Sequence, residues 1–231
     1  MMTCERTPNY AVDTLDSIFS TGPDFDELVE SGHATVAAIV DGQRYEYLGD
    51  YLNNGRIGID VLDDERRQMI DGADHARRIA ETCFRCIEST PEGADLLLIQ
   101  DDVEFASDWV ARLIDAIDAA EARRNNDTMT YALALYAAMK GMPPGIQPIV
   151  RYKPQHFYGT QAVYLPAMVV PKARSYFATH RTSGAMDDMI MKRFFIEHVS
   201  DLYAVNPNVV QHVGGVSTHG GPQRSSPSFR R

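Results

Sequence analysis

The segment that most constrains this chain is the apolar run LLLI at residues 96–99, followed at once by Gln100, Asp101 and Asp102. Four consecutive apolar residues are typical of a strand buried on both faces, as in a parallel α/β sheet. Ligands of such sheets bind outside the carboxyl ends of the strands. The two aspartates are therefore predicted either to hold a hard cation beside a ligand or to be solvated acids near the start of the next helix.

Strand-like and helix-like segments alternate along the chain, which favours an α/β sheet that is largely parallel in its first half. Apolar runs bounded by turn residues predict the strands, and apolar stripes with a period near 3.6 predict the helices. The segment MTYALALYAAM at residues 129–139 fits either element. The strands are expected at residues 1–4, 34–40, 94–100 and 161–166, and the helices at 11–20, 65–88, 107–124, 171–180 and 187–199.

Single residues mark where several helices begin and which face each helix buries. Asn9 and Ser107 are suited to cap the helices that follow them, Pro171 suits a first helical turn, and Gly72 predicts a kink or interruption. The residues expected to face the core are Val12, Leu15, Ile18 and Phe19 in the first helix, and Val110, Leu113, Ile114 and Ile117 in the helix after Ser107.

Charge and cysteine usage exclude several classes of protein. A formal net charge of −10 and a pI near 5.1 argue against binding to nucleic-acid phosphates. No apolar run approaches the roughly 20 residues of a membrane-spanning helix, and the first residues lack an apolar signal segment, so a cytoplasmic protein is expected. Three cysteines do not describe a disulfide framework. Cys83 and Cys86 have no partners for a zinc or redox site, which favours buried helix cysteines.

The segment LLLIQDDVEF resembles the metal-binding DxD-type motif of GT-A glycosyltransferases, which also occurs as EDD. Four other segments accompany it in the order of that family: TCERTPNYAVDTLDSIF, YGTQAVYLP, SGAMDDMIMKRFF and NPNVVQHVGGVST. The last is similar to the QHVG segment of the N-acetylglucosaminyltransferase IV group. The resemblance implies a single-domain, Rossmann-type mixed sheet, mostly parallel and flanked by helices. Residues 1–105 would bind the nucleotide sugar and residues 106–216 the acceptor, before a tail at 217–231 that is expected to be flexible.

On this resemblance, Asp102 binds Mn²⁺ or Mg²⁺, and Asp101 supports the metal or contacts the nucleotide ribose. His212 is implied as a metal ligand or a contact to the diphosphate, and an imidazole ligand favours Mn²⁺. Gln100 stands where relatives often have an acid. From the residues alone, His212 fits a loop histidine bonded to the backbone equally well.

The other candidate residues are expected around the donor and the acceptor. Asp187 is the expected general base beside the acceptor hydroxyl, with Asp188 as the alternative. Both acids also suit the N-terminus of a helix for purely structural reasons. The residues expected to contact the nucleotide sugar are Thr3, Arg6, Gly159 and Gln161. A surface loop or a tight turn is the alternative role for these positions.

Together these expectations describe a metal-dependent, inverting transfer of a sugar to a hydroxyl acceptor, such as a glycan. UDP-N-acetylglucosamine is the expected donor on the resemblance alone. One alternative is a nucleotidyltransferase or another nucleotide-sugar enzyme that uses the same sheet. The other is a non-catalytic protein that binds nucleotide sugars.

Overall fold

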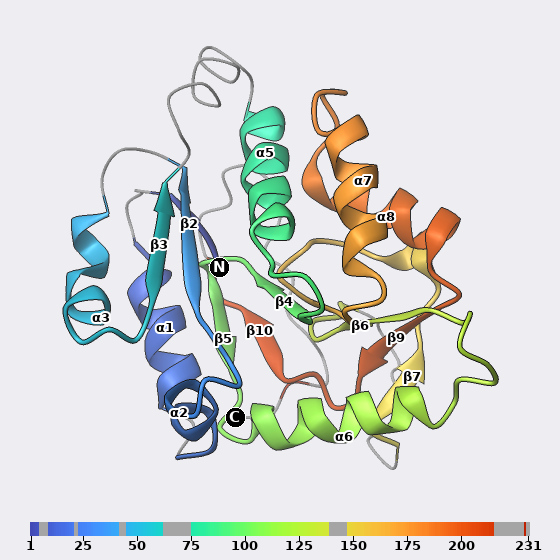
Figure 1. The fold of residues 1–231 in the computed structure, drawn as a ribbon, viewed down its shortest axis with the longest axis horizontal. Helices are drawn as coiled ribbons and strands as arrows, with labels where there is room; N and C mark the ends of the chain where they lie inside the picture. The colour runs from blue at the N-terminus through green and yellow to red at the C-terminus, as the bar shows by residue number, and fades with distance from the viewer. Residues whose placement is uncertain are drawn as a thin grey trace.

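The structure is a computed structural model, and it describes residues 1–4, 9–20, 23–41, 45–61, 75–138, 147–214 and 229. The described chain is a mixed α/β protein in which helices cover both faces of the β-structure (Figure 1). None of the described helices has the length and apolar character needed to cross a lipid bilayer.

The N-terminal sheet consists of three parallel strands in the order β1-β2-β3. Its members are β1 (Met2–Cys4), β2 (Ala37–Asp41) and β3 (Gly58–Val61). The predicted parallel pairing of the first half of the chain thus holds for β1, β2 and β3 but not for the strands that start at Leu96 and Val103, which pair antiparallel. β3 was not predicted, because its residues are only partly buried and do not form an apolar run. The helices between these strands are α1 (Ala11–Phe19), α2 (Pro23–Glu30), the short η1 (Glu46–Leu48) and α3 (Gly49–Asn53).

The second sheet is mixed, so the expectation of mostly parallel pairing does not hold for it. Its five strands are arranged in the order β4-β8-β6-β9-β7, and only the pairing of β6 with β9 is parallel. Strand β8 runs against both of its neighbours, β4 and β6, and so accounts for two of the antiparallel pairings. The strands are β4 (Leu96–Ile99), β6 (Tyr131–Ala134), β7 (Ile149–Arg151), β8 (Ala162–Leu165) and β9 (Asp201–Val205).

One bridge and one hairpin complete the β-structure. Met2 of β1 forms an isolated parallel bridge with Gln100, which directly follows β4, and this bridge joins the two sheets edge to edge. Beyond the end of β4, β5 (Val103–Phe105) pairs antiparallel with β10 (Val210–His212). Neither three-residue strand was predicted, because each is too short to display an alternating pattern.

Alternate residues of the strands bury themselves on opposite faces, which produces two apolar cores. Leu98 and Val163 belong to one core, whereas their neighbours Ile99 and Tyr164 belong to the other. The first core lies under α5 (His75–Glu88), α7 (Val170–His180) and α8 (Asp187–His198), and the second lies under α1, α2 and α6 (Trp109–Glu121).

Helix α1 begins at Ala11 as predicted, although Tyr10 and not Asn9 is its N-cap residue, and the predicted cap of α6 is wrong. The side-chain oxygen of Asn9 accepts a hydrogen bond from the Ala11 backbone N–H at 3.0 Å. In α6 the residue before the first turn is Asp108 rather than Ser107. Ile114 was expected in the buried stripe but is 49% exposed. The buried residues of the helix are instead Trp109, Val110, Leu113, Ala116 and Ala120. Ile114, the residue after Leu113, points to solvent.

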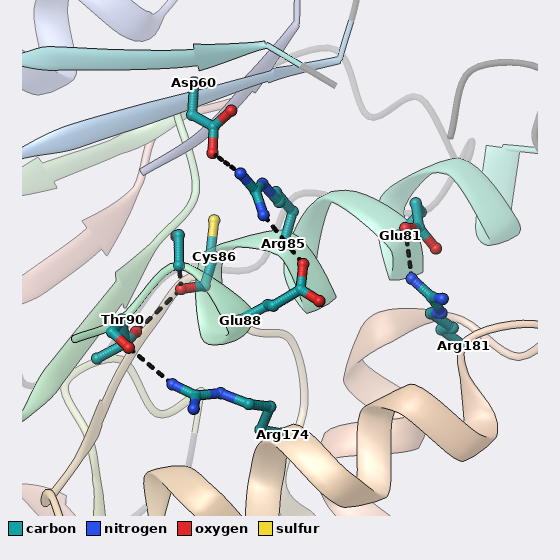
Figure 2. Close-up of polar contacts among 9 residues, drawn as sticks. Asp60, Glu81, Arg85, Cys86, Glu88, Thr90, Arg174 and Arg181 are labelled. Atoms are coloured by element: carbon teal, nitrogen blue, oxygen red, sulfur yellow. Dashed lines mark hydrogen bonds and ion pairs between the residues drawn. The ribbon is translucent and has the colours of Figure 1, made fainter. Parts of the chain in front are cut away.

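Two arginines hold α5 against its neighbours (Figure 2). Arg85 lies 2.6 Å from a carboxylate oxygen of Asp60 on β3 and 3.0 Å from one of Glu88. Arg181, which follows α7, pairs at 2.7 Å with Glu81, of which only 2% is exposed. The Arg181–Glu81 ion pair therefore holds the start of the segment between α7 and α8 against α5.

Helix α7 begins as predicted and is fastened to the chain that follows α5. Pro171 lies in its first turn, where the missing N–H of proline breaks no helical hydrogen bond. Arg174 donates to the Thr90 carbonyl oxygen at 2.7 Å (Figure 2). Polar contacts therefore lie at both ends of the α5–α7 interface: the Arg181–Glu81 ion pair at one end and the Arg174–Thr90 hydrogen bond at the other.

The two cysteines of α5 are buried and free. Burial raises the pKa of the Cys86 thiol to about 11 and that of Cys83 well above its usual value. Neither thiol is therefore activated as a nucleophile, in agreement with the predicted core role. The helix expected at residues 65–88 is confirmed from His75 onward, while the expected kink at Gly72 lies outside the described residues.

Candidate functional site

Gln100, Asp101 and Asp102 follow β4 directly, at the junction of the two sheets. The Gln100 backbone N–H donates to the Gln161 carbonyl oxygen at 2.9 Å and so extends the pairing of β4 with β8. On its other side Gln100 bridges to Met2. The two aspartates therefore lie where β1 and β4 end, at the edge of an α/β sheet where ligands bind.

Asp101 is held by hydroxyl groups from the N-terminal part of the chain. Only 6% of Asp101 is exposed, and its Oδ2 accepts a hydrogen bond from the Thr3 hydroxyl at 2.8 Å. The Tyr47 hydroxyl lies 3.1 Å from the Thr3 hydroxyl oxygen. Because Thr3 donates its only proton to the carboxylate, Tyr47 is the donor to Thr3. The candidates Thr3 and Asp101 thus lie together, and Tyr47 joins them.

Thr14 of α1 fixes the backbone that carries the two aspartates. Its hydroxyl accepts from the Val103 N–H at 3.1 Å and lies 2.9 Å and 2.8 Å from the carbonyl oxygens of Asp101 and Val103. Thr14 is completely buried. Sequence reasoning missed Thr14. The signal that could have identified it is a hydroxyl residue on the otherwise apolar face of α1.

Asp102 and His212 meet although 110 residues separate them in the sequence. Asp102 Oδ2 lies 3.2 Å from His212 Nε2, and both side chains are mostly buried. The pairing of β10 with β5 sets this position, because it places His212 opposite Val103. The Val213 N–H also donates to the Asp102 carbonyl oxygen at 2.9 Å. The two candidate metal ligands are therefore adjacent.

The Asp102–His212 pair has a spacing that suits two neighbouring ligands of one cation. Two donor atoms at right angles, each about 2.1 Å from a divalent metal, are about 3.0 Å apart. No group of three or more His, Cys, Asp or Glu side chains suited to a metal occurs among the described residues. The described chain thus offers two donors here, and a bound phosphate and water can supply the remainder.

Gly214 closes this pair from one side. A Cβ atom at position 214 would lie 2.6 Å from Asp102 Oδ2 and 3.0 Å from His212 Nε2. Such separations are too short for non-bonded atoms, so a side chain here would displace the carboxylate or the imidazole. The sequence included Gly214 in the QHVG similarity but predicted no role for it.

On the hypothesis that Asp102 and His212 bind Mn²⁺, Gly214→Ala is expected to lower the affinity for that ion by roughly ten- to a hundredfold, as displacement of groups that orient metal ligands commonly does. Isothermal titration of Mn²⁺ into the purified protein measures the effect. Gly49→Ala is the matched control, since a Cβ at position 49 meets nothing within 4 Å. An unchanged Mn²⁺ affinity in folded Gly214→Ala protein would contradict the close approach described above.

Asp187 lies at the N-terminus of α8 and is 2% exposed. Its Oδ2 accepts hydrogen bonds from the Thr160 hydroxyl and from the Gln100 side-chain amide, the latter at 3.4 Å. Burial raises the Asp187 pKa to about 6, against the effect of these hydrogen bonds. Asp187 is therefore enclosed and well satisfied as an acceptor.

Asp188 is the more open of the two acids at this helix end. The residue is partly exposed, although its Oδ1 is itself buried and, among the described residues, has no hydrogen-bond partner. A carboxylate that is only partly enclosed can take a proton from an incoming hydroxyl. The geometry thus distinguishes the two candidates, which the sequence did not.

Three residues that were predicted to contact the nucleotide sugar remain: Gly159, Gln161 and Arg6. Gly159 has a φ of 77°, a conformation that favours glycine. The Gln161 side chain lies over Gly159, in the space that a sugar was expected to occupy. Gln161 is itself 8% exposed. Arg6 lies outside the described residues.

No protein-family model matches this chain, and no curated protein matches its sequence.

Proposed function

We propose that this chain is a metal-dependent glycosyltransferase that uses a nucleotide-sugar donor. The observation that carries the proposal is the approach of His212 to Asp102 beside the buried Asp101. A cation-binding pair next to a fixed carboxylate, at the carboxyl ends of parallel strands, suits a nucleoside diphosphate.

The donor side consists of the end of β4 and the residues packed around it. Asp102 and His212 would hold the cation, and the imidazole nitrogen favours Mn²⁺ over Mg²⁺. When bound, the cation neutralises negative charge on the departing diphosphate. Asp101 is buried and held by Thr3 and Tyr47, so its proposed role is to support Asp102 and the bound cation. UDP-N-acetylglucosamine is the proposed donor.

The acceptor side is centred on the N-terminus of α8. Asp188 is proposed as the general base that removes the proton of the acceptor hydroxyl, because it is partly exposed and Asp187 is enclosed. A base that acts on the face opposite the leaving diphosphate produces inversion at the sugar carbon. Asp187 holds the segment on which the base lies.

The direct test is binding of UDP to the wild-type chain and to Asp102→Ala, each with and without Mn²⁺, by isothermal titration calorimetry. Wild-type protein is expected to bind UDP more tightly when Mn²⁺ is present, and Asp102→Ala is expected to lose that dependence. Asp115→Ala, which removes an exposed acid of α6, is the matched control for net charge. Metal-independent UDP binding that survives Asp102→Ala would overturn the proposal.

The products separate this proposal from its alternatives. Transfer releases UDP and places the sugar on an acceptor, whereas a nucleotidyltransferase releases pyrophosphate when it joins a nucleotide to a sugar phosphate. A binding protein yields neither product although it binds UDP with Mn²⁺. Two incubations, one with UDP-sugar and an acceptor and one with UTP and a sugar phosphate, followed by chromatographic separation of the products, therefore assign the class.

A further inference from the structure

Gln100 lies between the proposed donor and acceptor sides and contacts both. Its backbone pairs with Met2 on one side and with Gln161 on the other. Its side-chain amide nitrogen lies 2.9 Å from the Thr160 hydroxyl and 3.4 Å from Asp187 Oδ2. One residue thus touches β1, β8 and α8.

The direction of each hydrogen bond in this group is fixed by chemistry. An ionised carboxylate only accepts, so the Thr160 hydroxyl donates its single proton to Asp187. The Thr160 oxygen must then accept from the Gln100 amide, which has protons to donate. Thr160 is completely buried, and Asp187 nearly so. The hydrogen bonds therefore run in one direction only, from the Gln100 amide to the Thr160 hydroxyl and from that hydroxyl to the Asp187 carboxylate.

We propose that Gln100 and Thr160 are positioning residues that, together with Asp187, fix the location of Asp188 relative to Asp101 and Asp102. This inference rests on the proposed function. Asp187 directly precedes Asp188 in the first turn of α8, so the network holds the residue next to the proposed base. At the other end, Gln100 precedes Asp102 by two residues, about 7 Å of extended chain.

The network explains why a glutamine serves here in place of an acid. A carboxylate at position 100 would face the Asp187 carboxylate across one hydroxyl, and that hydroxyl can donate to only one of them. The neutral amide donates instead, and both halves of the site are held in one arrangement. A small misplacement of the base relative to the donor is costly, because an error near 1 Å can lower a rate about a hundredfold.

The first test compares Thr160→Val with Thr160→Ser. Thr160→Val is expected to lower kcat for transfer at least tenfold while changing the Kd of UDP with Mn²⁺ less than about threefold. Thr160→Ser keeps the hydroxyl and is expected to restore most of kcat. Thr82→Val is the matched control, since it removes another buried hydroxyl, which donates to the Arg78 carbonyl oxygen within α5. A kcat unchanged by Thr160→Val would overturn the proposal.

The second test exchanges donor and acceptor across the network. Gln100→Glu is expected to lower both kcat and Tm, because two carboxylates then compete for the Thr160 proton. In Q100E/D187N the new carboxylate accepts from Thr160 and from the Asn amide, so Tm and kcat are expected to exceed those of Gln100→Glu alone. Strictly additive effects of the two substitutions on Tm and kcat would contradict the proposed network. Without wild-type transfer the proposed function fails first, and the Tm cycle still decides whether the three groups interact.

Discussion

Asp188→Asn is expected to lower the rate of sugar transfer by about 10²- to 10⁴-fold, which is the usual contribution of a positioned general base. The Kd of UDP in the presence of Mn²⁺ is expected to remain within about threefold of the wild-type value. The reason is that Asp188 lies at the N-terminus of α8, where it is partly exposed, whereas the proposed donor-binding residues follow β4. Single-turnover transfer and calorimetric UDP titration measure the two quantities separately.

Asp187→Asn is the matched comparison, since it makes the same chemical change one residue earlier. The enclosed Asp187 contacts Thr160 and Gln100 rather than solvent, and asparagine retains an oxygen that can accept from Thr160. Its effect on transfer is therefore expected to be smaller, roughly tenfold or less. If Asp187→Asn abolishes transfer while Asp188→Asn retains it, the two roles are reversed, as the sequence first suggested.

The second large effect is a pH-dependent change in stability that originates at Asp187. Burial raises its pKa in the folded protein from the ordinary 3.8 to about 6. The folded state therefore binds this proton more tightly than the unfolded chain does. The stabilisation is fully present below pH 3.8 and is lost as the pH rises through about 6, and a shift of this size corresponds to about 3 kcal/mol.

Urea unfolding of wild-type protein and Asp187→Asn between pH 4 and pH 7 measures this effect. The free energy of unfolding of the wild type minus that of the variant is expected to fall by about 2.4 kcal/mol between pH 4 and pH 7, because asparagine does not titrate. Asp188→Asn removes a charge from the same helix end and serves as the control for general charge effects. A stability difference that stays constant, or that rises with pH, would show that folding does not raise the pKa of Asp187.

The local features of the site were predictable because each has a short-range cause. The apolar run that forms β4 ends at Gln100, and this sufficed to predict acids at a strand end. The N-terminus of α8 follows from the adjacent acids Asp187 and Asp188, which complement the helix dipole. Such signals depend on neighbouring residues alone, so they can be read from the sequence.

The features that were not predicted depend on partners far along the chain. β5 and β10 are three residues each, and they become strands only by pairing with one another. The contact of Tyr47 with Thr3 spans 44 residues and follows from no local pattern. The enclosure of Asp187 likewise depends on Thr160 and α5 packing around it, which the two adjacent acids do not disclose.

The long separation between Asp102 and His212 bears on how the chain reaches its final state. His212 arrives beside Asp102 only when β10 joins β5, and β10 is the last strand of the described chain. A nascent chain that has emerged only as far as α8 carries one of the two donor groups and not the other. A cation held by both groups, as proposed, would bind the fully folded chain in preference to a partly folded one and would stabilise it by mass action.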